Sequence, residues 1–219
     1  MDIEIFSDLI CPWCFIGKRR LDRALERVAG DDIRIQWRPF QLYPDLPAEG
    51  VDREAFYKAR FGADADARKV GARIAEEAQE AGIALDYARI VRVPNTLLGH
   101  RLVAFFDGDP RQHDLMDALF TAYFTQGRDL GDVGVLADIA AGFGADAAAV
   151  RARLASDELT REIRGQVKGA YNAGLSGVPC FVLAGRFGIP GAQPVDTMRQ
   201  FIERARERVA AEASAQAES

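Results

Sequence analysis

The chain of 219 residues has little cysteine, little histidine and no long apolar run. Its three cysteines are too few for a disulfide framework. A metal site is also disfavoured, because Cys180, His100 and His113 do not stand in tandem ligand spacing beside another pair. No stretch approaches the length needed to cross a membrane. We therefore expect no bound metal and no membrane partner.

The chain also lacks a strong charge of either sign. Its formal net charge is −5, and acidic and basic residues are interspersed. This balance disfavours nucleic acid and anionic membrane surfaces as partners. The sequence begins Met1-Asp2-Ile3-Glu4 without the basic and apolar regions of a secretory leader. We therefore expect a cytoplasmic protein, in a compartment where thiols are kept reduced.

Two of the three cysteines stand close together, in the run Cys11-Pro12-Trp13-Cys14. A short apolar segment precedes this run and a helical pattern follows it, which places Cys11 at a helix start. Free backbone N–H groups and the peptide dipoles stabilise a thiolate there. Pro12 suits the first helical turn, and Cys14 lies on the same helix face. The spacing predicts a redox dithiol in which Cys11 is the nucleophile and Cys14 the resolving thiol.

A purely structural disulfide is the weaker interpretation of this pair. Such a short ring constrains the unfolded chain very little and would add little stability.

The remaining sequence predicts strands at both ends and helices between them. Residues 33–37, 180–183 and 186–189 have strand character, and 195–210 reads as a closing helix. Seven helical patterns fill the middle, at 53–61, 65–81, 96–106, 114–125, 133–141, 145–154 and 158–173. We expect an α/β chain in which residues 1–48 and 174–212 form one sheet-containing domain. Residues 49–173 would form a helical insertion domain, and 213–219 a frayed tail.

Four motifs carry a resemblance to a known family. They are Ser7-Asp8-Leu9-Ile10-Cys11-Pro12-Trp13-Cys14, Asn95-Thr96-Leu97-Leu98-Gly99-His100-Arg101-Leu102, Ser176-Gly177-Val178-Pro179 and Gly191-Ala192-Gln193-Pro194. The chain resembles the DsbA-like branch of the thioredoxin superfamily, and within it the FrnE-like group. That group is similar to 2-hydroxychromene-2-carboxylate isomerases and kappa-class glutathione transferases. The resemblance implies a thioredoxin-like fold, with a β-α-β and β-β-α sheet and a large all-helical insertion.

The resemblance also implies a substrate site around the dithiol. It predicts a cis peptide bond between Val178 and Pro179 beside Cys11, with the Val178 backbone holding an extended peptide or the cysteinyl part of glutathione. Pro12 and Trp13 would belong to the same surface, although Trp13 could equally pack under the insertion. No cofactor is required, and glutathione is a candidate co-substrate.

Three further residues are weaker candidates for this site. The family gives Asn95 a substrate-lining role, whereas its sequence context favours a helix N-cap. His100 would border the site, but a lone histidine is more often a surface or satisfied core residue. Gln193 precedes the last helix, whose N-terminus could hold the γ-glutamyl carboxylate of glutathione. We expect Cys180 to be an inert core thiol and His113 a solvated loop residue.

Three functions remain open at this point. The first is thiol-disulfide exchange on a protein or small-molecule substrate. The second is a glutathione-dependent isomerase or transferase of a small aromatic compound, although related enzymes carry serine where Cys11 stands. The third is a redox-sensing, chaperone-like binding module. An apolar helix face could also support a homodimer.

Overall fold

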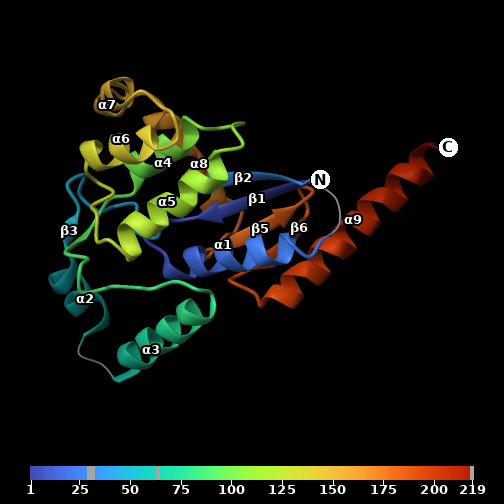
Figure 1. The fold of residues 1–219 in the computed structure, drawn as a ribbon, viewed down its shortest axis with the longest axis horizontal. Helices are drawn as coiled ribbons and strands as arrows, with labels where there is room; N and C mark the ends of the chain where they lie inside the picture. The colour runs from blue at the N-terminus through green and yellow to red at the C-terminus, as the bar shows by residue number, and fades with distance from the viewer. Residues whose placement is uncertain (29–32, 63–64, 218–219) are drawn as a thin grey trace.

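The computed structural model describes residues 1–28, 33–62 and 65–217, and its centre is a four-stranded mixed sheet (Figure 1). The strands are β1 (Asp2–Ser7), β2 (Arg34–Pro39), β5 (Cys180–Leu183) and β6 (Phe187–Pro190), in the order β2-β1-β5-β6. β1 pairs with β2 in parallel and with β5 in antiparallel, and β5 pairs with β6 in antiparallel. The two ends of the chain therefore meet in one sheet, and the expected thioredoxin-like fold is confirmed.

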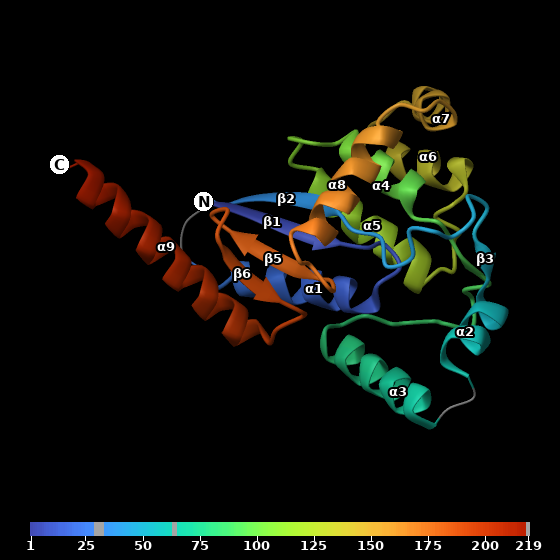
Figure 2. The ribbon, with the colours of Figure 1, turned by 180° about the vertical axis from the view of Figure 1, so that it is seen from behind.

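Two helices pack against each other along this sheet, α1 (Pro12–Leu25) and α9 (Val195–Ala217) (Figures 1 and 2). The structure corrects the expected end of α9, which continues well past residue 210. Residues 211–217 are mostly alanine, with one glutamate and one glutamine, and these residue types have high helix propensity. Glu212 also pairs with Arg186 from the turn between β5 and β6.

Seven helices lie between β2 and β5 in the sequence. They are α2 (Arg53–Phe61), α3 (Ala65–Glu80), α4 (Leu97–Ala104), α5 (Gln112–Phe124), α6 (Val133–Ala141), α7 (Ala147–Ala155) and α8 (Thr160–Asn172). Their ends differ from the expected ones by one or two residues at most. A two-stranded pairing of β3 (Val51–Asp52) with β4 (Arg92–Val93) was not expected from the sequence.

The inserted helices share one continuous core with the sheet and α1. The Phe15 ring of α1 stacks on Phe120 of α5, with 5.2 Å between centroids, and on Phe124 at 6.1 Å. Trp37 of β2 meets Phe120 edge-on at 6.2 Å. Because these aromatic contacts bury much apolar surface, the insertion holds α1, and with it the dithiol, in a defined position.

Over the ranges described, no helix is both long and apolar enough to cross a membrane.

Candidate functional site

Cys11 stands at the point where strand β1 gives way to helix α1. After Ser7 the chain turns, and the Cys11 N–H donates to the Asp8 carbonyl at 3.1 Å. Cys11 is the N-cap of α1, and Pro12 follows in the first turn. The side chain is buried, and its Sγ lies 3.6 Å from the Val178 carbonyl oxygen. The thiol therefore sits at the N-terminus of α1, beside the loop that carries Val178.

Cys14 lies one turn further along α1 and is almost fully enclosed, at 1% exposed. Its N–H donates to the Cys11 carbonyl at 3.0 Å, and both thiols are free. Burial raises the pKa of Cys14 well above its ordinary value, and the neighbouring Cys11 raises it further. Interactions with the Ser7 hydroxyl and the Asp8 backbone partly oppose this rise in pKa. The pair thus combines a thiol at the N-terminus of helix α1, Cys11, with a second thiol, Cys14, whose pKa is raised by burial.

The loop before β5 faces this pair. Its Val178–Pro179 peptide bond is cis. A Cβ on Gly17 of α1 would come within 2.9 Å of Pro179 Cγ and 3.2 Å of Phe181 Cζ, so this close approach needs a glycine. The Pro179 carbonyl also accepts a 2.8 Å hydrogen bond from the Gly191 N–H. The cis-proline loop is thereby held between α1 and the segment that leads into α9.

Gln193 lies in that segment, before the first residue of α9. Its side-chain amide donates to the Pro190 carbonyl at 2.6 Å and so folds back on its own loop. The structure therefore gives Gln193 a role in shaping the loop, and a role in binding glutathione stays a prediction.

Helix α4 closes the other side of the loop that carries Cys11. A Cβ on Gly99 would lie 2.3 Å from Leu9 Cδ1, so the helix meets the loop with no space to spare. His100 is buried, with Nε2 2.9 Å from the Phe40 carbonyl and 3.6 Å from Asp8 Oδ1. Nε2 carries the proton in this arrangement because a carbonyl oxygen can only accept.

Asp8 is one of the site residues that sequence reasoning missed. It is fully buried, and its Oδ2 accepts a 2.6 Å hydrogen bond from the Leu42 N–H. Its Oδ1 has no hydrogen-bond partner within the described chain. The signal was present, since Asp8 lies in the first of the four motifs, but a buried acid cannot be recognised from its spacing alone.

Asn95 ties two loops together rather than standing free. Its Nδ2 donates to the Leu46 carbonyl at 2.7 Å, and its Oδ1 accepts from Gln41 and from the Leu97 N–H at 3.0 and 3.1 Å. The N-cap residue of α4 is Thr96, so Asn95 caps the helix from one residue further out. Asn95 also borders a surface groove of about 470 Å³.

Trp13 is half-buried, and the Arg73 guanidinium of α3 lies 5.7 Å from the centre of its ring. Nearby, the Arg53 guanidinium lies 4.7 Å from the Tyr57 ring and 5.1 Å from the Tyr87 ring. Burial raises the pKa of both tyrosines, and the charge of Cys11 contributes a smaller rise to each. Aromatic and cationic groups from α2, α3 and the turn that follows α3 therefore lie near the dithiol. Sequence reasoning missed the two tyrosines and Arg53.

The prediction for His113 is wrong. The residue lies in α5 and is half-buried, because this helix begins two residues earlier than expected. Its Nδ1 accepts from Trp37 Nε1 at 3.2 Å, and its Nε2 lies 2.6 Å from Asp22 Oδ1 of α1. His113 is therefore a link between α1, β2 and α5.

Cys180, which we expected to be an inert core thiol, is less buried than a core position implies. Cys180 is half-buried at the start of β5, and burial raises the pKa of its thiol. A raised pKa keeps a thiol protonated and unreactive.

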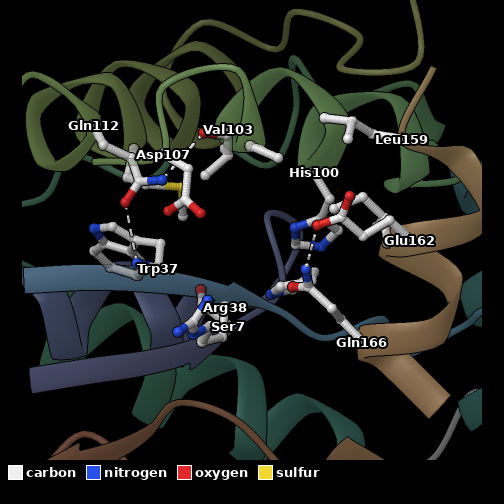
Figure 3. A pocket seen from close by; sticks show the side chains of 14 residues that line it. Ser7, Trp37, Arg38, His100, Val103, Asp107, Gln112, Leu159, Glu162 and Gln166 are labelled. Atoms are coloured by element: carbon white, nitrogen blue, oxygen red, sulfur yellow. Dashed lines mark hydrogen bonds between the residues drawn. The ribbon is translucent and has the colours of Figure 1, made fainter. Parts of the chain in front are cut away.

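A small cavity lies between β2 and helices α4, α5 and α8 (Figure 3). It measures about 70 Å³. Ser7 and Arg38 border it from the sheet, and His100 borders it from α4. Across the cavity, the Gln112 side chain joins the Trp37 N–H and the Val103 carbonyl at 3.1 Å each.

Among the residues that the structure describes, no group of three His, Cys, Asp or Glu side chains could hold a metal ion.

Comparison with known proteins agrees with this architecture. The family model of the DsbA-like thioredoxin domain matches residues 2–203, and the chain belongs to this family. The uncharacterized protein YwbO of Bacillus subtilis is 26% identical over 201 residues, covering 91% of this chain and 94% of that protein. A probable DsbA oxidoreductase from Streptomyces coelicolor has a similar structure, with 30% identity and a TM-score of 0.82. That match covers 94% of this chain and 89% of the other.

Two more distant solved structures share the fold. A 2-hydroxychromene-2-carboxylate isomerase matches with a TM-score of 0.67 at 16% identity, covering 99% of both chains. The cytosolic disulfide reductase DsbM from Pseudomonas aeruginosa matches with the same TM-score and identity, covering 95% of this chain and all of the other. DsbM is also known in a structure with glutathione. The family, together with the Streptomyces coelicolor structure at 30% identity, supports an oxidoreductase or a related enzyme.

Proposed function

We propose that the protein is a thiol-disulfide oxidoreductase that works through Cys11 and Cys14. The observation that carries the proposal is the placement of the two sulfurs. Cys11 caps a helix with its Sγ toward the Val178 carbonyl, and Cys14 is enclosed one turn later. A thiol at a helix start, with a second and more fully enclosed thiol one turn behind it, is an arrangement that suits disulfide exchange.

In the reducing direction, the Cys11 thiolate attacks one sulfur of a substrate disulfide. The other substrate sulfur leaves as a thiolate and takes a proton from water. Cys14 then loses its proton and attacks Cys11 Sγ, which releases the second substrate thiol and leaves a Cys11–Cys14 disulfide. Two electrons pass from the protein dithiol to the substrate, and a cellular thiol returns the protein to its reduced form.

The substrate contacts follow from the residues around Cys11. We assign substrate contact to Pro12, Trp13 and the Val178–Pro179 loop, whose backbone can pair with an extended peptide or with glutathione. His100 is buried against the Phe40 carbonyl, so its contribution is to hold the loop before Cys11.

Asn95 and Gln193 are the two outer candidates. Each is fixed by hydrogen bonds to its own loops, and a substrate would meet them only at the edge of the site.

Glutathione and a cytoplasmic setting belong to the same proposal. A cytoplasmic thiol pool would reduce the Cys11–Cys14 disulfide, and the cytosolic DsbM gives a precedent in this fold. Residues 1–48 and 174–212 would form the redox domain, while the insertion at 49–173 supplies the walls of the site.

The test follows single turnovers of the reduced protein with a small aromatic disulfide that releases a coloured thiol. We expect Cys11→Ser to abolish the reaction. Cys14→Ser should release one equivalent of thiol and stop at a mixed disulfide that mass spectrometry detects. Cys180→Ser is the matched control and should turn over like the wild type, because this thiol is kept protonated.

Two outcomes would favour the other functions. Glutathione-dependent isomerisation of an aromatic substrate that survives Cys14→Ser would indicate an isomerase. Undiminished binding of unfolded clients by a Cys11→Ser, Cys14→Ser double variant, without any disulfide turnover, would indicate a chaperone-like module.

A further inference from the structure

The Ser7 hydroxyl is a buried polar group without a satisfied partner. Ser7 is the last residue of β1 and is 1% exposed. Within the described chain its Oγ makes no well-aligned hydrogen bond. Burying a hydroxyl without a hydrogen-bond partner destabilises the folded state. Such a group in a native protein is usually explained by a bound water or ligand, or by a function in catalysis.

The Ser7 hydroxyl interacts with the resolving thiol, Cys14. The interaction of its hydroxyl with Cys14 acts to lower the pKa of that thiol, although it falls short of a well-aligned hydrogen bond. The contribution of Asp8 to Cys14 comes from its backbone, not from its carboxylate. The Asp8 carboxylate is instead directed to the Leu42 N–H and the His100 ring.

Ser7 also borders the small cavity of Figure 3. The cavity has room for water, and its rim supplies the polar partners that a buried water needs. Its lining extends from Ser7 past His100 to the exposed side chains of Asp107 and Glu162. Ser7 therefore both interacts with the enclosed thiol and lines a cavity whose polar rim reaches the surface.

The resolving step creates a need for such a path. Cys14 must lose its proton before it can attack, and the thiol has almost no contact with solvent of its own. Proton transfer through a positioned group accelerates steps of this kind.

We propose that Ser7 relays the proton of Cys14 to water in this cavity, an inference that rests on the proposed disulfide exchange. In the mixed disulfide, Ser7 Oγ accepts the proton from Cys14 Sγ while its own hydroxyl proton passes to a water molecule. The Cys14 thiolate attacks Cys11 Sγ, the bond between Cys11 and the substrate sulfur breaks, and the substrate leaves as a thiolate. That thiolate takes up a proton from solvent, so protons and electrons balance.

Several charged or titratable groups face this path and enter its pH dependence. Cys11 and Asp8 lie beside Cys14, and the cavity is lined by Arg38, His100, Asp107 and Glu162. Arg38 is paired with Glu4 at 2.6 Å.

The test compares Ser7→Ala with the wild type in two separately measured steps. The first step is the attack of Cys11 on the aromatic disulfide, which is followed by the colour of the released thiol. The second step is the closure of the Cys11–Cys14 disulfide, which is monitored by rapid acid quenching and mass spectrometry. We expect Ser7→Ala to leave the first rate within about twofold and to slow closure near pH 7 by at least about tenfold. The loss should shrink as the pH rises, and added imidazole should partly restore closure.

Ile5→Val is the matched control, because it trims a buried side chain on the same face of β1 without touching a proton donor. It should slow neither step and should not alter the pH profile. Equal closure rates in Ser7→Ala and wild type, or an equal loss in both steps of Ser7→Ala, would overturn the relay. A wild type that never closes its disulfide would overturn the proposed function instead, so the two failures can be told apart.

Discussion

Helices α4 and α2 both border the dithiol, yet they are anchored in opposite ways. Five of the eight residues of α4 are buried, whereas none of the nine residues of α2 is. On α4, the Arg101 side chain donates to four backbone carbonyls in the segment 153–158. On α2, the anchors are aromatic contacts such as Phe56 against Tyr43, at 4.9 Å between centroids.

The difference suggests a division of work around one reactive centre. A helix buried on most sides has few ways to move and fixes what it touches, which here is the loop before Cys11. A helix with little buried surface opens at low free-energy cost and can adapt to substrates of different shape. We therefore expect α4 to be the rigid helix of this site and α2 the adaptable one.

The largest loss of stability should come from removing the Arg101 side chain, which anchors α4. Arg101→Met keeps the apolar stem but leaves the carbonyls without their cationic donor. We expect a loss of about 3 kcal/mol in the free energy of unfolding, since buried acceptors then lack partners. Chemical denaturation measures this value. Arg151→Met is the control, because Arg151 makes an exposed ion pair with Asp138 and should cost under about 1 kcal/mol. Equal losses in the two variants would contradict the anchoring of α4.

A smaller loss of stability is expected where Gly99 of α4 packs against Leu9, in the loop before Cys11. In Gly99→Ala the new methyl collides with Leu9, which is fully buried and cannot swing away. Overpacking of this kind should cost about 1–3 kcal/mol of stability. It should also slow the first attack by Cys11, since the loop that places the thiol must shift.

Gly165→Ala in α8 is the matched control for that substitution. A Cβ there would meet nothing within 4 Å, so alanine should be neutral or stabilise the helix by about 0.5–1 kcal/mol. If both alanine variants melt at the temperature of the wild type, α4 does not hold the loop in the way described.

The parts of the site that could be predicted are those carried by neighbouring residues. Cys11, Pro12 and Cys14 identify the dithiol because a strand, a proline and a helical pattern stand beside them in the sequence. The sheet could likewise be expected from strand patterns at both ends. No local pattern, however, shows that Asp8 will meet His100, which lies in a helix far along the chain.

The errors have the same origin. Sequence context presented His113 as part of a turn, but its two ring nitrogens bond to Trp37 and Asp22 from other elements. Tertiary packing decided its position and extended the helix over it. Likewise, the cavity beside Ser7 is formed by a strand and three helices, and no single segment indicates it.

The smallest effect on global stability should come from α2. Tyr57→Ala removes a ring that is 38% exposed and lies against the Arg53 guanidinium. We expect a loss under about 1 kcal/mol, or a fall of no more than about 4 °C in the melting temperature. Hydrogen exchange should instead show faster exchange of the α2 amides with no change in α4, because only the local opening of α2 becomes easier. The contrary result would be a fall in melting temperature as large as that of Gly99→Ala, with faster exchange in both helices. It would mean that α2 and α4 unfold as one unit and that α2 is not the more adaptable helix.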